Sequence, residues 1–150
     1  MHKFYVFVVR VCALLVAIGL ALAVPGCGPA VFISPYDEVT DQQVTGLQKS
    51  VDGLLATLDR TPVPDYASAK PTYDQIRSDL ASLRARNTVR TKNQITVQQL
   101  DALQKELQDL EDQHRNSKLI QVMVPPARDT LDATFLAILK LEIAKKEQAN

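Results

Sequence analysis

The residue types that most often do chemistry, cysteine and histidine, are scarce in this chain of 150 residues. The chain has two cysteines, Cys12 and Cys27, and two histidines, His2 and His114. Once the leader described below is removed, a histidine-dependent catalytic or metal site would have to use His114. That residue continues the leucine stripe of a predicted helix near its C-terminus, where a lone histidine is more often a capping or buried hydrogen-bonded residue. We therefore predict no catalytic, cofactor-binding or metal-binding residue. An envelope enzyme or accessory that uses His114 is the alternative.

Sequence motifs for other chemistries are missing as well. No glycine follows Gly53, which excludes a phosphate-binding glycine loop from the C-terminal two thirds of the chain. There is no GxSxG, HExxH or DxDxDG pattern. Carboxylates are plentiful, but no pair stands in an apolar setting that would shift a pKa. The prediction is therefore that the protein is not an enzyme.

A basic stretch covers the end of the second predicted helix and the loop that follows, and consists of Arg84, Arg86, Arg90 and Lys92. Cations at a helix C-terminus complement its dipole, which is the simplest interpretation. The alternative is contact with lipid phosphates or with an acidic partner. The next predicted helix carries acids that could pair with this stretch if the fold brings them together, namely Glu106, Asp109, Glu111 and Asp112.

The N-terminus has the pattern of an export signal. Lys3 and Arg10 precede an apolar run over residues 11–24, and a positive region followed by 7–15 apolar residues is typical of a secretory signal peptide. The run is shorter than the roughly 20 residues that span a bilayer as a helix. We expect residues 1–26 to be removed, which discards Cys12 and leaves Cys27 as the single thiol.

The run ends in Val24-Pro25-Gly26-Cys27, which resembles the lipobox of bacterial lipoproteins. The resemblance implies cleavage after Gly26 and acylation of Cys27, and so a membrane as partner through that lipid. Gly28 follows, where aspartate commonly holds Gram-negative lipoproteins at the inner membrane, so the resemblance implies the outer membrane, facing the periplasm. Two alternatives are an ordinary cleavage site with Cys27 as a bystander, and an uncleaved membrane anchor over residues 4–24.

Composition limits what the remaining chain does. The 17 basic residues include Lys3 and Arg10, whereas none of the 17 acidic residues lies in the leader, so the mature chain has two more acids than bases. This near-neutral balance argues against a nucleic-acid partner, which needs a basic footprint. Residues 27–35 form a short lipidated tether; its segment 28–35 reaches at most about 26–29 Å, so the domain over residues 36–150 is expected close to the membrane.

Hydrophobic spacing predicts four helices in that domain. Apolar residues recur at steps of three and four, the period of an amphipathic helix. In the last helix, Leu141 and Ile143 are expected to extend the apolar face. The segment 118–124 is either extended or one helical turn. The predicted helices cover residues 36–60, 65–89, 96–115 and 126–146.

Local signals predict where these helices begin. Ser34 is a possible N-cap with Pro35 at the first turn, and Thr96 opens a capping-box pattern. Pro71 indicates either a kink or a start at Thr72. Glycines 46 and 53 lie inside the first helix, where close approach of a neighbouring helix would explain them.

The predicted fold class is all-α, an antiparallel bundle of about four helices, because short connections make sequential helices antiparallel. The segments YDEVTDQQVTGLQKSVDGLL and FLAILKLEIAKK resemble small uncharacterised helical lipoproteins of Gram-negative bacteria, a resemblance that brings no assigned activity. We expect a membrane-anchored periplasmic protein that binds or scaffolds, through a protein partner or as a homo-oligomer. A phage- or plasmid-encoded lysis or exclusion lipoprotein is a further alternative.

Overall fold

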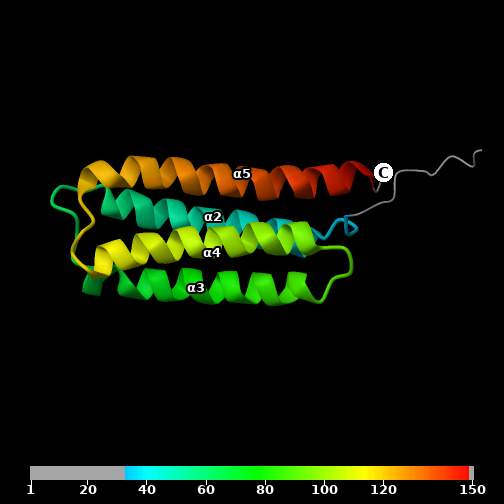
Figure 1. The fold of residues 1–150 in the computed structure, drawn as a ribbon, viewed down its shortest axis with the longest axis horizontal. Helices are drawn as coiled ribbons and strands as arrows, with labels where there is room; N and C mark the ends of the chain where they lie inside the picture. Colours follow the sequence, from blue (N-terminus) through cyan, green and yellow to red (C-terminus); the bar gives the residue numbers. More distant parts are fainter. Residues whose placement is uncertain (1–32, 149–150) are drawn as a thin grey trace, which may run out of the picture. The chain divides into compact units, whose positions relative to one another are not determined.

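Four long helices form an antiparallel bundle in the computed structural model, which describes residues 33–148. Each helix packs on two neighbours, in the ring α2–α3–α4–α5–α2, and successive helices run in opposite directions (Figure 1). A single turn of 3₁₀ helix, η1, precedes the last one. The predicted fold class is confirmed. The elements are α2 (Glu38–Leu58), α3 (Tyr66–Thr88), α4 (Gln94–Arg115), η1 (Gln121–Met123) and α5 (Val124–Gln148).

The core consists of the apolar stripes that the spacing predicts. In α2, residues 44, 47, 51, 54 and 58 are all buried, and the equivalent stripes of the other helices close over them. Burying such a stripe removes roughly 1.5–3 kcal/mol of unfavourable hydration for each large side chain. The bundle therefore follows from the period of the sequence.

Two predicted helix starts are wrong, and for the same reason. α2 begins at Glu38 with Asp37 as N-cap, because the Ser34 hydroxyl donates to Asn93 Oδ1 (2.7 Å) and does not cap. α4 begins at Gln94, which places Thr96 inside the helix. The Thr96 hydroxyl likewise does not cap, because it accepts a hydrogen bond from Lys145 of α5.

The start of α3 decides between the two interpretations of Pro71. The helix begins at Tyr66, and the Asp65 side chain accepts a hydrogen bond from the Ser68 amide (2.9 Å). It continues through Pro71, so a start at Thr72 is excluded. The Asp65 cap fixes the first turn ahead of the proline.

The glycines of α2 do not mark a close helix contact. Gly46 and Gly53 are exposed, and a Cβ atom built on either would meet nothing within 4 Å. The explanation by close approach of a neighbouring helix is therefore wrong.

The last helix begins two residues earlier than expected. Pro125 and Pro126 occupy its first turn, where a missing N–H leaves no helical hydrogen bond unmade. Of the two interpretations of residues 118–124, the helical turn is confirmed as η1. The expected face near its end is wrong, because Ile143 is 56% exposed whereas Glu142 is 1% exposed.

Candidate functional site

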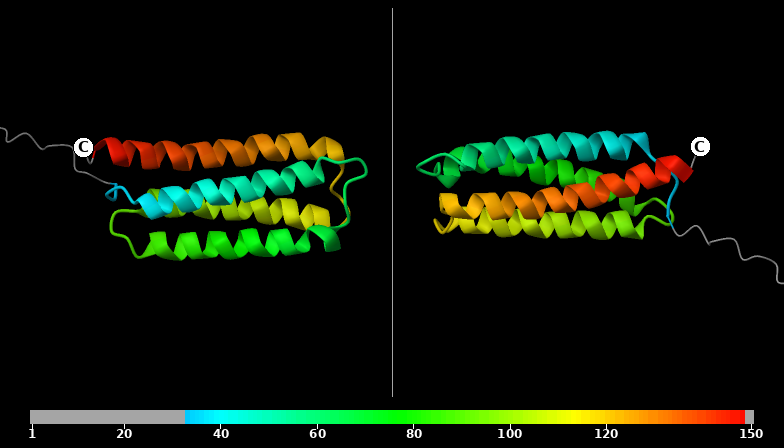
Figure 2. Two further views of the ribbon diagram at one scale, coloured as in Figure 1. Left: turned by 180° about the vertical axis from the view of Figure 1, so that it is seen from behind. Right: turned by 90° about the horizontal axis from the view of Figure 1, so that it is seen from above.

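Polar side chains gather in the interior at one end of the bundle, where the start of α2, the end of α3, the start of α4 and the end of α5 meet. The two views of Figure 2 show these four ends together. We call this group the buried polar network. It consists of Ser34, Thr40, Asn87, Asn93, Thr96, Glu142 and Lys145, all buried.

Lys145 is the centre of charge in the buried polar network. Its Nζ donates to Glu142 Oε1 (2.5 Å), Thr96 Oγ1 (2.7 Å) and Asn93 Oδ1 (2.9 Å). An ammonium group has three donors, so all three are used. Glu142 Oε2 is buried without a hydrogen-bond partner among the described residues.

Asn93 links the network to the segment that precedes the bundle. Its Oδ1 accepts from Ser34 as well as from Lys145, and its Nδ2 donates to Asn87 Oδ1 (2.6 Å). Asn87 in turn donates to the Leu83 carbonyl (2.8 Å). Residues distant in sequence are thereby fixed at one point.

Two arginines, one in α3 and one in the loop that follows it, hold residues 34–37, the segment that leads into α2. Asp37 pairs with Arg86 (2.8 Å) and Arg90 (3.4 Å), and Arg90 also donates to the Pro35 carbonyl (2.9 Å). The Arg86 hydrogen bond holds the pKa of the Asp37 carboxyl well below its usual range, with Thr40 and Arg90 adding to the effect. Residues 34–37 are thus held to the bundle by side chains of α3 and of the loop between α3 and α4.

The basic stretch therefore pairs with acids other than those named from the sequence. Arg86 and Arg90 use Asp37, and Arg84 pairs with Asp101. Within residues 33–148, none of the four acids of α4 that were named from the sequence pairs with the basic stretch. Asp101 lies about two turns from the start of α4, beside the last turns of α3, where it meets Arg84.

The three tyrosines of the described residues lie in the core or at its edge. Tyr73 is buried and Tyr66 packs against the core. Tyr36 is half-buried, and its hydroxyl donates to Asp41 (2.8 Å), which raises the pKa of Tyr36 to about 12. The Tyr36 hydrogen bond thus also holds residues 34–37 to the first turn of α2.

His114 is a buried hydrogen-bonded residue, which confirms the simpler interpretation. Its Nε2 lies 2.8 Å from the Pro64 carbonyl and its Nδ1 lies 3.3 Å from the Tyr73 hydroxyl. A carbonyl only accepts, so Nε2 carries the proton and Nδ1 accepts from Tyr73 in the neutral ring. Neither nitrogen is left to act on a substrate.

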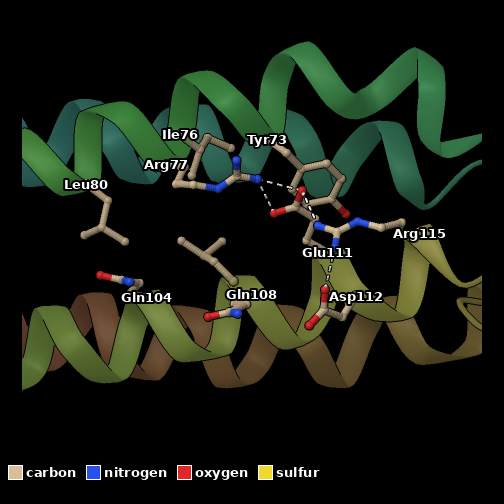
Figure 3. Close-up of a pocket in the computed structure, with 10 residues that line it drawn as sticks. Tyr73, Ile76, Arg77, Leu80, Gln104, Gln108, Glu111, Asp112 and Arg115 are labelled. Atoms are coloured by element: carbon tan, nitrogen blue, oxygen red, sulfur yellow. Dashed lines mark hydrogen bonds and ion pairs between the residues drawn. The ribbon is translucent and has the colours of Figure 1, made fainter.

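A cavity of about 250 Å³ lies beside this cluster between α3 and α4 (Figure 3). Ile76, Leu80 and Leu107 contribute apolar walls. At its polar end Arg77 and Arg115 both reach Glu111, as Figure 3 shows. The cavity can accept an apolar side chain or a small amphipathic group.

The charges at that polar end are mutually satisfied. Glu111 accepts from Arg77 (2.5 Å), Tyr66 (2.7 Å) and Arg115 (3.0 Å). Burial opposes ionisation of Glu111, but these hydrogen bonds outweigh it and lower its pKa. Burial raises the pKa of Tyr73. Within residues 33–148, no group of three histidine, cysteine or acidic side chains is placed to hold a metal ion.

The residues singled out for lipid attachment and cleavage, Val24, Pro25, Gly26 and Cys27, lie outside the described residues. Among residues 33–148, no helix has the length and apolar character needed to cross a bilayer. No family model, curated protein or solved structure matches this chain.

The buried Lys145–Glu142 pair is the feature that sequence reasoning missed. Glu142 follows Leu131, Phe135 and Ile138 at steps of four, three and four. Extending that stripe would have placed Glu142 in the core. Its charge argued against burial, because an isolated buried charge is costly and only a partner offsets it.

Proposed function

We propose that this protein is a lipid-anchored component of the bacterial cell envelope that acts by binding or scaffolding and not by catalysis. Removal of residues 1–26 would leave Cys27 acylated at the new N-terminus. Attachment through two or more acyl chains would be stable, whereas one chain binds only marginally. The observation that carries the proposal is the Val24-Pro25-Gly26-Cys27 motif after an apolar run.

The fastening of residues 34–37 supports a tethering role. Ser34 follows Cys27 by seven residue steps, which span at most about 23–25 Å. Ser34, Pro35 and Asp37 are each bonded to the bundle. A lipid on Cys27 would therefore hold this end of the bundle near the membrane surface, facing the periplasm from the outer membrane given Gly28.

The chemistry of the described residues favours binding over catalysis. Both ring nitrogens of His114 have protein partners. The carboxylate of Glu111 is held by two arginines. These groups stabilise helix packing, so a His114-dependent enzyme has little support.

Mass spectrometry of the membrane fraction tests the anchor. The expected mature protein starts at an acylated Cys27, and Cys27→Ala leaves it unprocessed or soluble. Cys12→Ala is the matched control, because it changes a thiol within the leader and should leave processing intact. An intact Met1 in the mature protein would refute the proposal. Crosslinking in cells followed by purification then tests binding, and the absence of any reproducible envelope partner, a second copy included, would refute the scaffolding role.

A further inference from the structure

The outward face of α5 carries two large exposed hydrophobic residues beyond its first turn, which the outward faces of the other three helices do not. Leu136 and Ile143 are 51% and 56% exposed, seven residues apart on one side of the helix. Ala133, Ala137 and Ala144 extend the same surface. The other large exposed hydrophobic residues of the described chain lie in connections or in the first turn of a helix, namely Val39, Val89, Ile95, Ile120 and Val122.

Neither neighbouring helix covers this face. The border with α2 is marked by Arg128 and Asp52 (3.9 Å), and the border with α4 by Thr134 and Glu106 (2.9 Å). At 100° per residue, Lys140 lies midway between these borders and opposite the core stripe, with Leu136 about 40° from it on the side of α2. In Figures 1 and 2 no described helix lies on the side of α5 that faces away from α2 and α4.

The residues along this face alternate at steps of four and three, the spacing of a coiled-coil seam. Three apolar and three charged residues occupy these positions. We name this set the α5 outer stripe. It consists of Asp129, Ala133, Leu136, Lys140, Ile143 and Glu147.

We propose that the α5 outer stripe binds the same stripe of a second copy of this chain, with the two α5 helices antiparallel. The inference identifies the partner in the proposed scaffolding role, but it does not depend on acylation of Cys27. A second copy is the expected partner because of the order of charges along the stripe. One base lies between two acids, so two copies can place opposite charges against each other.

Charge complementarity selects the antiparallel arrangement. In a parallel pair Lys140 would face Lys140 of the second copy, and like charges directly opposed are unfavourable. An antiparallel pair centred between Thr134 and Phe135 places Lys140 opposite Asp129 of the second copy. The same register sets Leu136 opposite Ala133, a large side chain against a small one. Symmetry produces each contact twice.

The same charges disfavour a lipid surface as the occupant. A helix that lies on a membrane carries basic residues beside its apolar face. Here Asp129 and Glu147 stand in the stripe itself, and burial of either carboxylate in the lipid boundary would be unfavourable. In the antiparallel pair described above, Lys140 of the second copy faces Asp129 and satisfies its charge.

Single-cysteine crosslinking in membranes tests the register. In the proposed dimer, position 133 lies about 4.5 Å along the axis from its equivalent, and position 144 about 28 Å. Ala133→Cys should crosslink into dimers with a short thiol reagent, and Ala144→Cys should not. Ala81→Cys, exposed on α3, is the matched control. The parent protein measures any background from Cys27, which separates failure of acylation from failure of the dimer.

Charge reversal tests the pairing in the Ala133→Cys background. Lys140→Asp should reduce dimer crosslinking at least about tenfold. The acid at position 140 would face Asp129 of the second copy, and symmetry repeats this repulsion at the other end of the dimer. Adding Asp129→Lys should restore it. Crosslinking of Ala133→Cys no greater than that of Ala81→Cys would overturn the proposal, and would be the result if the stripe lay on lipid. Equal crosslinking at positions 133 and 144 would overturn the antiparallel register.

Discussion

Lys145 and Glu142 form a buried ion pair within one helix, with Lys145 Nζ 2.5 Å from Glu142 Oε1 and the side chains only 2% and 1% exposed. Removing two charges from water is costly, so such a pair is weak evidence for stability by itself. Its three-donor geometry ties α5 to the start of α4 and, through Asn93, to Ser34. We infer that it fixes the register of α5 in the bundle.

Lys145→Met should destabilise the protein by about 3–5 kcal/mol, because it leaves the Glu142 carboxylate buried without its cation. Glu142→Leu combined with Lys145→Met should recover most of that loss, since both charges are then gone. Urea denaturation followed by circular dichroism measures both variants.

Lys105→Met is the control for that prediction. Lys105 pairs with Asp109 at 2.6 Å, but its side chain is 76% exposed. Surface pairs of this kind contribute little, so the change should stay within about 0.5 kcal/mol. A Lys145→Met variant as stable as the parent would show that the pair contributes nothing.

His114→Ala should lower the free energy of unfolding by about 1–3 kcal/mol, because it leaves the Tyr73 hydroxyl and the Pro64 carbonyl without their partner. Thermal and urea unfolding measure the loss. A His114→Gln variant that is as stable as the parent but loses its cellular phenotype would contradict a purely structural role and revive the catalytic alternative.

Asp37 should make stability depend on pH at the acid end. A carboxyl whose pKa is lower in the folded protein contributes stability above its unfolded pKa, near 4, and the contribution is lost as pH falls through the folded value. The pKa of Asp37 is lowered chiefly by the Arg86 hydrogen bond. Asp37→Asn should therefore be less stable at pH 7 and lose less stability between about pH 5 and 2.

Asp79→Asn is the charge-matched control for Asp37. Asp79 is exposed on α3 and accepts a hydrogen bond only from Gln75 among the described residues. Unfolding curves of the three proteins over this pH range make the comparison. If the free energy of unfolding fell as steeply with decreasing pH in Asp37→Asn as in the parent, the Asp37 contribution would be ruled out.

Gly46→Ala and Gly53→Ala should each stabilise the protein by about 0.5–1 kcal/mol. Alanine loses less conformational entropy than glycine in a helix interior, and the added methyl meets nothing within 4 Å at either position. Ala56→Gly, at an exposed position of the same helix, should cost a similar amount. Destabilisation by either alanine would indicate a neighbour on this face, such as a bound partner.

The fold was predictable because its signals are local. The steps of three and four in α2 and α4 identify helices and their buried faces without knowledge of any contact. The predicted caps at Ser34 and Thr96 were wrong, because these side chains have the chemistry of caps and use it in hydrogen bonds elsewhere.

The sequence by itself determined the number of helices and most of their apolar stripes, since periodicity depends on neighbouring residues; it also predicts an anchor at Cys27. Only the tertiary structure decided which polar groups are satisfied. Ser34 finds Asn93 across 59 residues, and Asn93 finds Lys145 across 52. A hydrogen bond depends on positions in space within about 3 Å, and such positions exist only after the stripes have packed.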